Sequence, residues 1–143
     1  MRRRAMRFLL AAAAATAFGG SSGARAALTE NDFYIRNAAD LVELCGVSAD
    51  DHLAREAIHF CHGFVSGAWQ YYRSVNSGPQ DEKLVCPPDP PPTRNQAVEL
   101  FVAWAKAPER AAYLQEPAVD TMFRFLIETW PCPKPAAQPE KKR

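Results

Sequence analysis

Hydrophobic side chains recur at three- and four-residue steps between His52 and Arg73, which indicates a long amphipathic helix. The apolar positions are Leu53, Ala57, Phe60, Cys61, Phe64, Ala68 and Tyr72. They follow one face of a helix of about six turns. Such a face must be covered by other elements, so we expect this helix at the centre of the fold.

Two glycines, Gly63 and Gly67, lie one turn apart inside this predicted helix. Each interior glycine costs roughly 1 kcal/mol relative to alanine. A pair at this spacing indicates that another backbone approaches the helix there. We therefore expect close helix packing at Gly63 and Gly67.

Two shorter segments carry capping signals ahead of apolar residues at helical spacing. Asn37 is an N-cap candidate for a short helix that ends at Gly46. Thr93 and Gln96 have the spacing of a capping box, which predicts a helix that Pro108 stops. Both segments are apolar on one side, so both need a packing partner.

Pro117 opens the clearest helical pattern in the chain, and Pro131 closes it. Its apolar positions are Val119, Met122, Phe123, Leu126, Ile127 and Trp130. No segment alternates apolar and polar residues over a useful length. The sequence therefore predicts an all-α fold, a small four-helix bundle.

A proline-rich connector separates the second predicted helix from the third, over residues 74–92. Its run Cys86-Pro87-Pro88-Asp89-Pro90-Pro91-Pro92 forbids a helix and favours a stiff, extended path. One interpretation is a ligand for a proline-reading domain. We favour a covalently held connector, because Cys86 can tie the segment to the core.

The first 26 residues have the pattern of a secretory signal peptide. Residues 1–7 carry four arginines and no acid, residues 8–18 are apolar, and residues 24–26 read Ala-Arg-Ala, a small-x-small cleavage site. The apolar run has about half the length that a membrane-spanning helix needs, so we expect no stable membrane anchor. Cleavage after Ala26 would leave a periplasmic or secreted protein.

Removal of this leader changes the charge balance. Five of the 17 basic residues and none of the 16 acidic residues lie in it, so the remaining 117 residues have a formal charge of −4. That charge gives no electrostatic reason to expect nucleic acid or an anionic membrane as a partner. The length suits one small domain, which we place at residues 27–132, followed by a disordered polar tail at 133–143.

All four cysteines, Cys45, Cys61, Cys86 and Cys132, lie beyond the leader. An even number in an exported chain predicts a disulfide framework, here of two bonds that each contribute about 2 to 4 kcal/mol. Four cysteines permit three pairings, and the sequence does not select one. We favour Cys45 with Cys61 and Cys86 with Cys132, because each bond would then bridge neighbouring elements.

The order of helices and cysteines has specific local signatures. They are Leu-Val-Glu-Leu-Cys45, the stretch Cys61-His62-Gly63-Phe64-Val65-Ser66-Gly67, Val85-Cys86-Pro87, and Trp130-Pro131-Cys132. Over about residues 38–132 this arrangement resembles the Tai/Rap family, the immunity proteins of type VI secretion. The C-x-G-F-V-x-G stretch and the terminal P-C are its most specific parts, whereas the proline run over 87–92 is longer than that pattern.

The resemblance implies a small, exported helical protein that binds and blocks a peptidoglycan-cleaving amidase effector in the periplasm. The four cysteines transfer from the family as structural residues. Partner-contact residues do not transfer one by one, because effector contacts vary between members. The sequence also leaves a homodimer open.

Histidines near a cysteine raise the alternative of an enzyme. His52, His59, Cys61 and His62 lie within eleven residues, and Cys with His is the usual start of a thiol nucleophile or a zinc site. On a helix, however, His62 points away from Cys61, and no metal-binding spacing occurs. We therefore expect no catalytic residue, no metal and no cofactor.

The aromatic residues divide into core and surface candidates. A domain of this size needs most of its large side chains for its core, where we expect Trp104, Phe123 and Trp130. Trp69 and Tyr71 fall off the main face of the long predicted helix, so they are our first candidates for partner binding.

Two functions from different classes follow. In one, the protein occludes the cleft of a toxin amidase and needs no chemistry of its own. In the other, it is a disulfide-stapled periplasmic stress protein without a toxin partner, such as a chaperone of the HdeA type, which exposes apolar surface when its carboxylates are protonated.

Overall fold

The computed structural model describes residues 26–78 and 82–133, which form four α-helices and two 3-10 helices. In chain order these are η1 Glu30–Phe33, α1 Ala38–Cys45, α2 Ala54–Val75, α3 Arg94–Ala105, η2 Pro108–Gln115 and α4 Ala118–Thr129. The described residues contain no strand, and Val85 and Pro131 form an isolated antiparallel bridge. The predicted all-α four-helix fold is confirmed.

Two predicted segments fall almost wholly on residues that are not described. The predicted signal peptide lies outside them up to residue 25, and the predicted tail lies outside them from residue 134. No helix within the described ranges is both long enough and apolar enough to cross a membrane.

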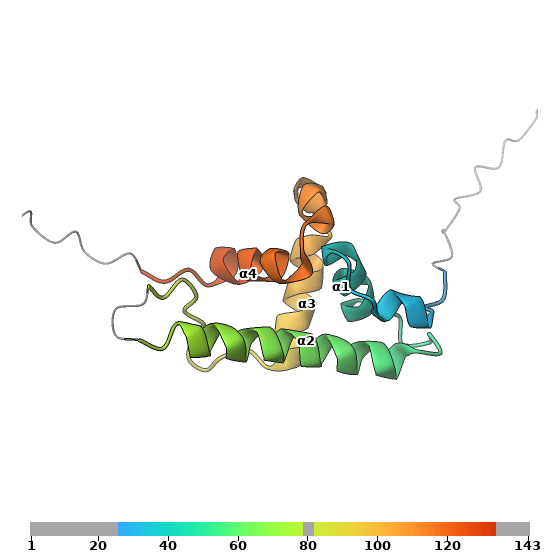
Figure 1. Ribbon diagram of the computed structural model, residues 1–143, viewed down its shortest axis with the longest axis horizontal. Coiled ribbons are helices and arrows are strands. Elements are labelled where there is room, and N and C mark those ends of the chain that lie inside the picture. Colours follow the sequence, from blue (N-terminus) through green and yellow to red (C-terminus); the bar gives the residue numbers. More distant parts are fainter. Residues whose placement is uncertain (1–25, 79–81, 134–143) are drawn as a thin grey trace, which may run out of the picture.

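The helices form a layered arrangement in which α2 and α4 run along the long axis and α3 crosses between them (Figure 1). The short helix α1 contacts α2, α3, α4 and both 3-10 helices. Five of its eight residues are buried, whereas α2 buries only Ala57 and Cys61 among its 22. The expectation that the long helix is central is therefore wrong, because α2 lies at the edge of the bundle and α1 occupies its middle.

The core is formed where α1, α3 and α4 meet. Leu41, Phe101 and Met122 each expose 1% of their surface or less. Phe101 also packs against Phe125, with ring centroids 5.6 Å apart. Thr121 is the buried polar residue of the described part of the chain, and its hydroxyl donates a hydrogen bond of 2.8 Å to the Tyr113 carbonyl. This bond joins η2 to the core, so the one buried hydroxyl is satisfied.

The predicted helix starts are confirmed by their caps. The Asn37 side chain accepts a hydrogen bond of 3.3 Å from the Asp40 amide at the start of α1. Thr93 and Gln96 form a reciprocal capping box at the start of α3. Pro117 is the N-cap of α4 rather than its first residue, because its ψ of 136° is extended.

Both disulfides have the favoured pairing. Cys45 at the end of α1 is bonded to Cys61 in α2, and Cys86 is bonded to Cys132 just after α4. The first bond fixes the edge helix to the central helix. The second fixes the proline-rich connector to the end of the bundle.

Asp51 connects the beginning of the described chain to the start of α2. Its carboxylate accepts hydrogen bonds of 2.9 Å from the Leu28 amide and 2.8 Å from the Leu53 amide. These two backbone hydrogen bonds, the Leu28 bond first, lower the pKa of Asp51 because they favour its charged form. Leu28 is thereby held in a buried position, where it forms a second hydrophobic cluster with Leu44 and Ala57.

Candidate interaction surface

A clamp of backbone and disulfide bonds holds one end of the proline-rich connector. The Cys86 amide donates a hydrogen bond of 2.8 Å to the Trp130 carbonyl, and the Cys132 amide donates one of 3.3 Å to the Leu84 carbonyl. The Cys86–Cys132 disulfide closes the same site. At its other end the connector runs directly into the capped start of α3 at Thr93. Residues 87–92, the proline segment, are therefore fixed at both ends.

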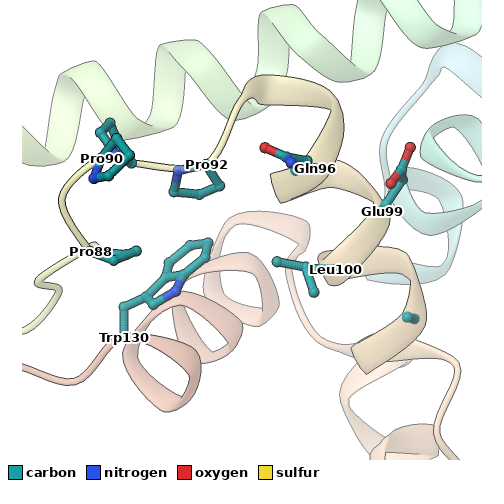
Figure 2. A pocket seen from close by; sticks show the side chains of 9 residues that line it. Pro88, Pro90, Pro92, Gln96, Glu99, Leu100 and Trp130 are labelled. Carbon is teal, nitrogen blue, oxygen red and sulfur yellow. The ribbon is translucent and has the colours of Figure 1, made fainter.

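One hollow lies between the proline segment and α3, with a volume of about 730 Å³ (Figure 2). It is lined by Pro88, Pro90, Pro91, Pro92, Gln96, Glu99, Leu100, Ala103 and Trp130. Leu100, which is 46% exposed, gives this hollow an apolar wall on the side of α3. We call this the α3 hollow.

A second hollow lies between the proline segment and α2, with a volume of about 340 Å³. It is lined by Val65, Ser66, Trp69, Arg73, Pro87, Pro91, Pro92, Arg94, Ala97, Leu126 and Trp130. We call this the arginine hollow. Trp130 lines both hollows, so the proline segment and this indole form the wall between them.

The two hollows differ in charge. The α3 hollow has Glu99 and no basic residue in its lining, whereas the arginine hollow has Arg73 and Arg94 and no acidic residue. Both arginines are exposed, and among the described residues neither guanidinium makes a hydrogen bond or an ion pair. Sequence reasoning missed this pair, because the arginines are far apart in the chain and line one hollow only where the proline segment folds back beside α2.

The predicted partner-binding aromatics occupy different environments. Tyr71 is 70% exposed, as expected. Trp69 is half-buried, packs against the core and stacks on Tyr72 with ring centroids 5.5 Å apart. The prediction that Trp69 lies off the core face is wrong. The connector that follows α2 folds back beside this helix, so a wider part of the helix surface is covered than its periodicity indicates. Partner binding by Trp69 and Tyr71 stays a prediction.

The three aromatics predicted for the core all pack against it and are half-buried: Trp104, Phe123 and Trp130. Trp104 stacks on Tyr113 with centroids 5.9 Å apart, and its indole N–H donates a hydrogen bond of 3.2 Å to Glu128. The Arg110 guanidinium lies 4.7 Å from the Trp104 ring. These contacts join α3, η2 and α4 outside the hollows.

Gly63 and Gly67 do not pack closely against another helix. Both are exposed, and a Cβ atom added at either position would have no described atom within 4 Å apart from its chain neighbours and the backbone of its own helix. The expectation of close helix packing is wrong, because the glycines line a shallow, open apolar groove together with Phe64 and Val119 instead of contacting another backbone. Contacts within the described chain do not explain this glycine pair.

The histidines do not form a site with Cys61. The Cys61 sulfur is bonded to Cys45, so it is not a free thiol. The imidazole Nδ1 of His52 lies 3.4 Å from the Asp51 carboxylate, His59 is exposed, and His62 has a buried Nε2 without a hydrogen-bond partner. Over residues 26–78 and 82–133, no group of three or more His, Cys, Asp or Glu side chains is arranged to hold a metal ion.

A protein-family comparison covers most of this structure. A family model described as Rap1a immunity proteins matches residues 37–132. The match begins at the N-cap of α1 and ends at Cys132, so it includes all four α-helices, both disulfides and the proline segment. No curated protein and no solved structure matches the chain.

Proposed function

The chain belongs to the family of Rap1a immunity proteins, and from that membership we propose that it binds a peptidoglycan-cleaving amidase toxin in the periplasm and blocks it. The family match over residues 37–132 is the observation that carries this proposal. Two disulfides support the compartment, because such bonds persist in oxidising environments such as the periplasm. The signal-peptide pattern of the first 26 residues points the same way.

The proposed mechanism is occlusion of the toxin's active-site cleft, which requires a rigid surface and no reaction by the immunity protein. The proline segment suits this task. Because both of its ends are already fixed, it loses little conformational entropy when a partner binds. Exposed aromatic side chains commonly supply the largest share of binding energy at such surfaces. Tyr71 and the half-exposed Trp69 are our candidate contacts.

The experiment pairs this protein with a secreted amidase encoded in a neighbouring reading frame. Cells that export the amidase alone should lyse, and cells that also produce the full chain should survive. Purified protein should inhibit peptidoglycan cleavage at a one-to-one ratio and should release no fragments by itself. Calorimetric titration that detects no binding, together with uninhibited cleavage, would contradict the proposal.

A leaderless variant separates binding from localisation. Residues 27–143 produced in the cytoplasm should not protect the cell from a periplasmic toxin. The same chain, purified and oxidised, should still inhibit the amidase in solution. Protection by the cytoplasmic form would show that the site of action is not the periplasm.

A further inference from the structure

The arginine hollow combines an apolar interior with two cations that have no partner among the described residues. Trp69, Leu126 and Trp130 give it large apolar walls, and Pro91 and Pro92 close one side. Arg73 lies in the last turn of α2, and Arg94 is the first residue of α3. An exposed guanidinium without an ion pair keeps its five donors for an external acceptor.

The chemistry of the lining selects an acidic, amphipathic occupant. Guanidinium groups bind carboxylates with charge-assisted and often bidentate hydrogen bonds. Apart from these two arginines, the lining of the hollow carries no charged group. The volume of the hollow, about 340 Å³, is near the lower end for ligand sites. This space suits one large side chain rather than an extended cofactor.

We propose that the arginine hollow binds a segment of a partner protein in which a large apolar side chain is next to a carboxylate. The apolar side chain enters between Trp69 and Trp130, and the carboxylate pairs with Arg73 and Arg94. This inference rests on the proposed function, because an immunity protein acts by binding another protein and the toxin would supply the segment. The proline segment adds a wall that is already in place before binding.

The first test uses short peptides and does not need the toxin. The oxidised protein, labelled with ¹⁵N, is titrated with acetyl-Glu-Leu-Phe-Glu-amide and followed through its indole N–H signals. The signals of Trp69 and Trp130 should move, whereas that of Trp104, which lies outside the hollow, should stay as an internal reference. The peptides acetyl-Lys-Leu-Phe-Lys-amide and acetyl-Glu-Ala-Ala-Glu-amide should bind at least about tenfold more weakly. Equal binding of all three peptides, or no binding of the first, would overturn the proposal.

Substitution of the cations gives the second test. The double variant Arg73→Gln, Arg94→Gln should keep its melting temperature, since neither side chain is paired in the described structure, and should lose peptide affinity roughly tenfold or more. Arg55→Gln is the control for a general charge effect, because Arg55 is an exposed arginine at the other end of α2, where it pairs with Glu56. A loss of equal size in the control would show a general charge effect and would overturn the assignment.

The toxin and a small amphiphile separate the remaining outcomes. If the amidase binds the wild-type protein and the double variant equally well, the arginine hollow is not part of the interface and this inference fails while the proposed function stands. If the amidase binds neither protein, the proposed function fails, and the peptide titration still decides whether the hollow binds acidic segments. Decanoate tests whether the hollow binds a small carboxylate instead of a protein segment. If decanoate moves the indole signals at concentrations where the first peptide does not, the proposal of a protein segment is overturned.

Discussion

At the residue scale, a single carboxylate holds the beginning of the described chain. Asp51 accepts two backbone hydrogen bonds, and the Leu28 amide is one of the donors. These bonds lower the folded-state pKa of Asp51 below its unfolded value, which is about 3.9. Their contribution to stability is therefore complete above that value and disappears as the pH falls through the folded-state pKa.

Asp51→Asn should lower the melting temperature at pH 7, because the neutral amide accepts backbone hydrogen bonds less strongly than the carboxylate does. The difference between wild type and variant should shrink as the pH falls below about 4, where the wild-type carboxylate becomes protonated. Thermal melts of both proteins from pH 7 downward measure this difference. A difference that stays constant over that range would show that the Asp51 charge does not stabilise the fold.

Trp104→Ala should reduce the free energy of unfolding by about 3 kcal/mol, the lower end of the range for large aromatic deletions, because Trp104 is half-buried. The variant loses the stacking on Tyr113 and the hydrogen bond to Glu128. Tyr71→Ala is the control and should change stability by no more than about 0.5 kcal/mol, since Tyr71 is 70% exposed. Urea unfolding followed by circular dichroism compares the two, and equal losses would contradict this division.

At the element scale, local signals predicted the helices well, and the surroundings of each helix face were harder to predict. Asn37 and Thr93 were recognisable as caps because a cap depends on residues within one turn of it. The position of Trp69 depends on a proline segment that begins many residues later in the chain. The periodicity of α2 likewise does not reveal that Gly63 lines an open groove, where an added Cβ would have free space.

Gly67→Ala should raise the free energy of unfolding by about 0.5 to 1 kcal/mol, because alanine loses less conformational entropy in a helix and its Cβ has free space here. Gly63→Ala should act in the same way. Gly46→Ala is the control, since its Cβ would lie 3.0 Å from the Val42 carbonyl oxygen and should give no gain. Chemical denaturation of the three variants measures these effects, and destabilisation by Gly67→Ala would show that something covers this face.

At the scale of the whole molecule, two disulfides constrain loops of different length. The Cys86–Cys132 bond spans 46 residues, and the Cys45–Cys61 bond spans 16. The second hydrophobic cluster and the central helix α1 lie near the shorter link, whereas the wall between the two hollows depends on the longer one. Stability and partner binding should therefore respond differently to the two bonds.

Removal of Cys86–Cys132 by paired serine substitutions should cost about 4 kcal/mol, and removal of Cys45–Cys61 should cost about 3 kcal/mol, because the loop-closure entropy grows with loop length. Denaturant midpoints of the two double variants measure the costs. Loss of the longer bond should also weaken binding of the acidic peptide, whereas loss of the shorter bond should leave it unchanged. The reverse order of peptide affinities would contradict the role assigned to the clamp.

The two covalent links enclose separate stretches of the chain, neither nested nor interleaved. In a polypeptide delivered from its N-terminus, the correct partner of Cys45 is then the next thiol to emerge, and the same holds for Cys86. An oxidase that joins thiols in order of emergence, whether on a ribosome or at a translocation pore, therefore produces both native bonds at the first attempt. Maturation of this protein should consequently proceed without a disulfide isomerase.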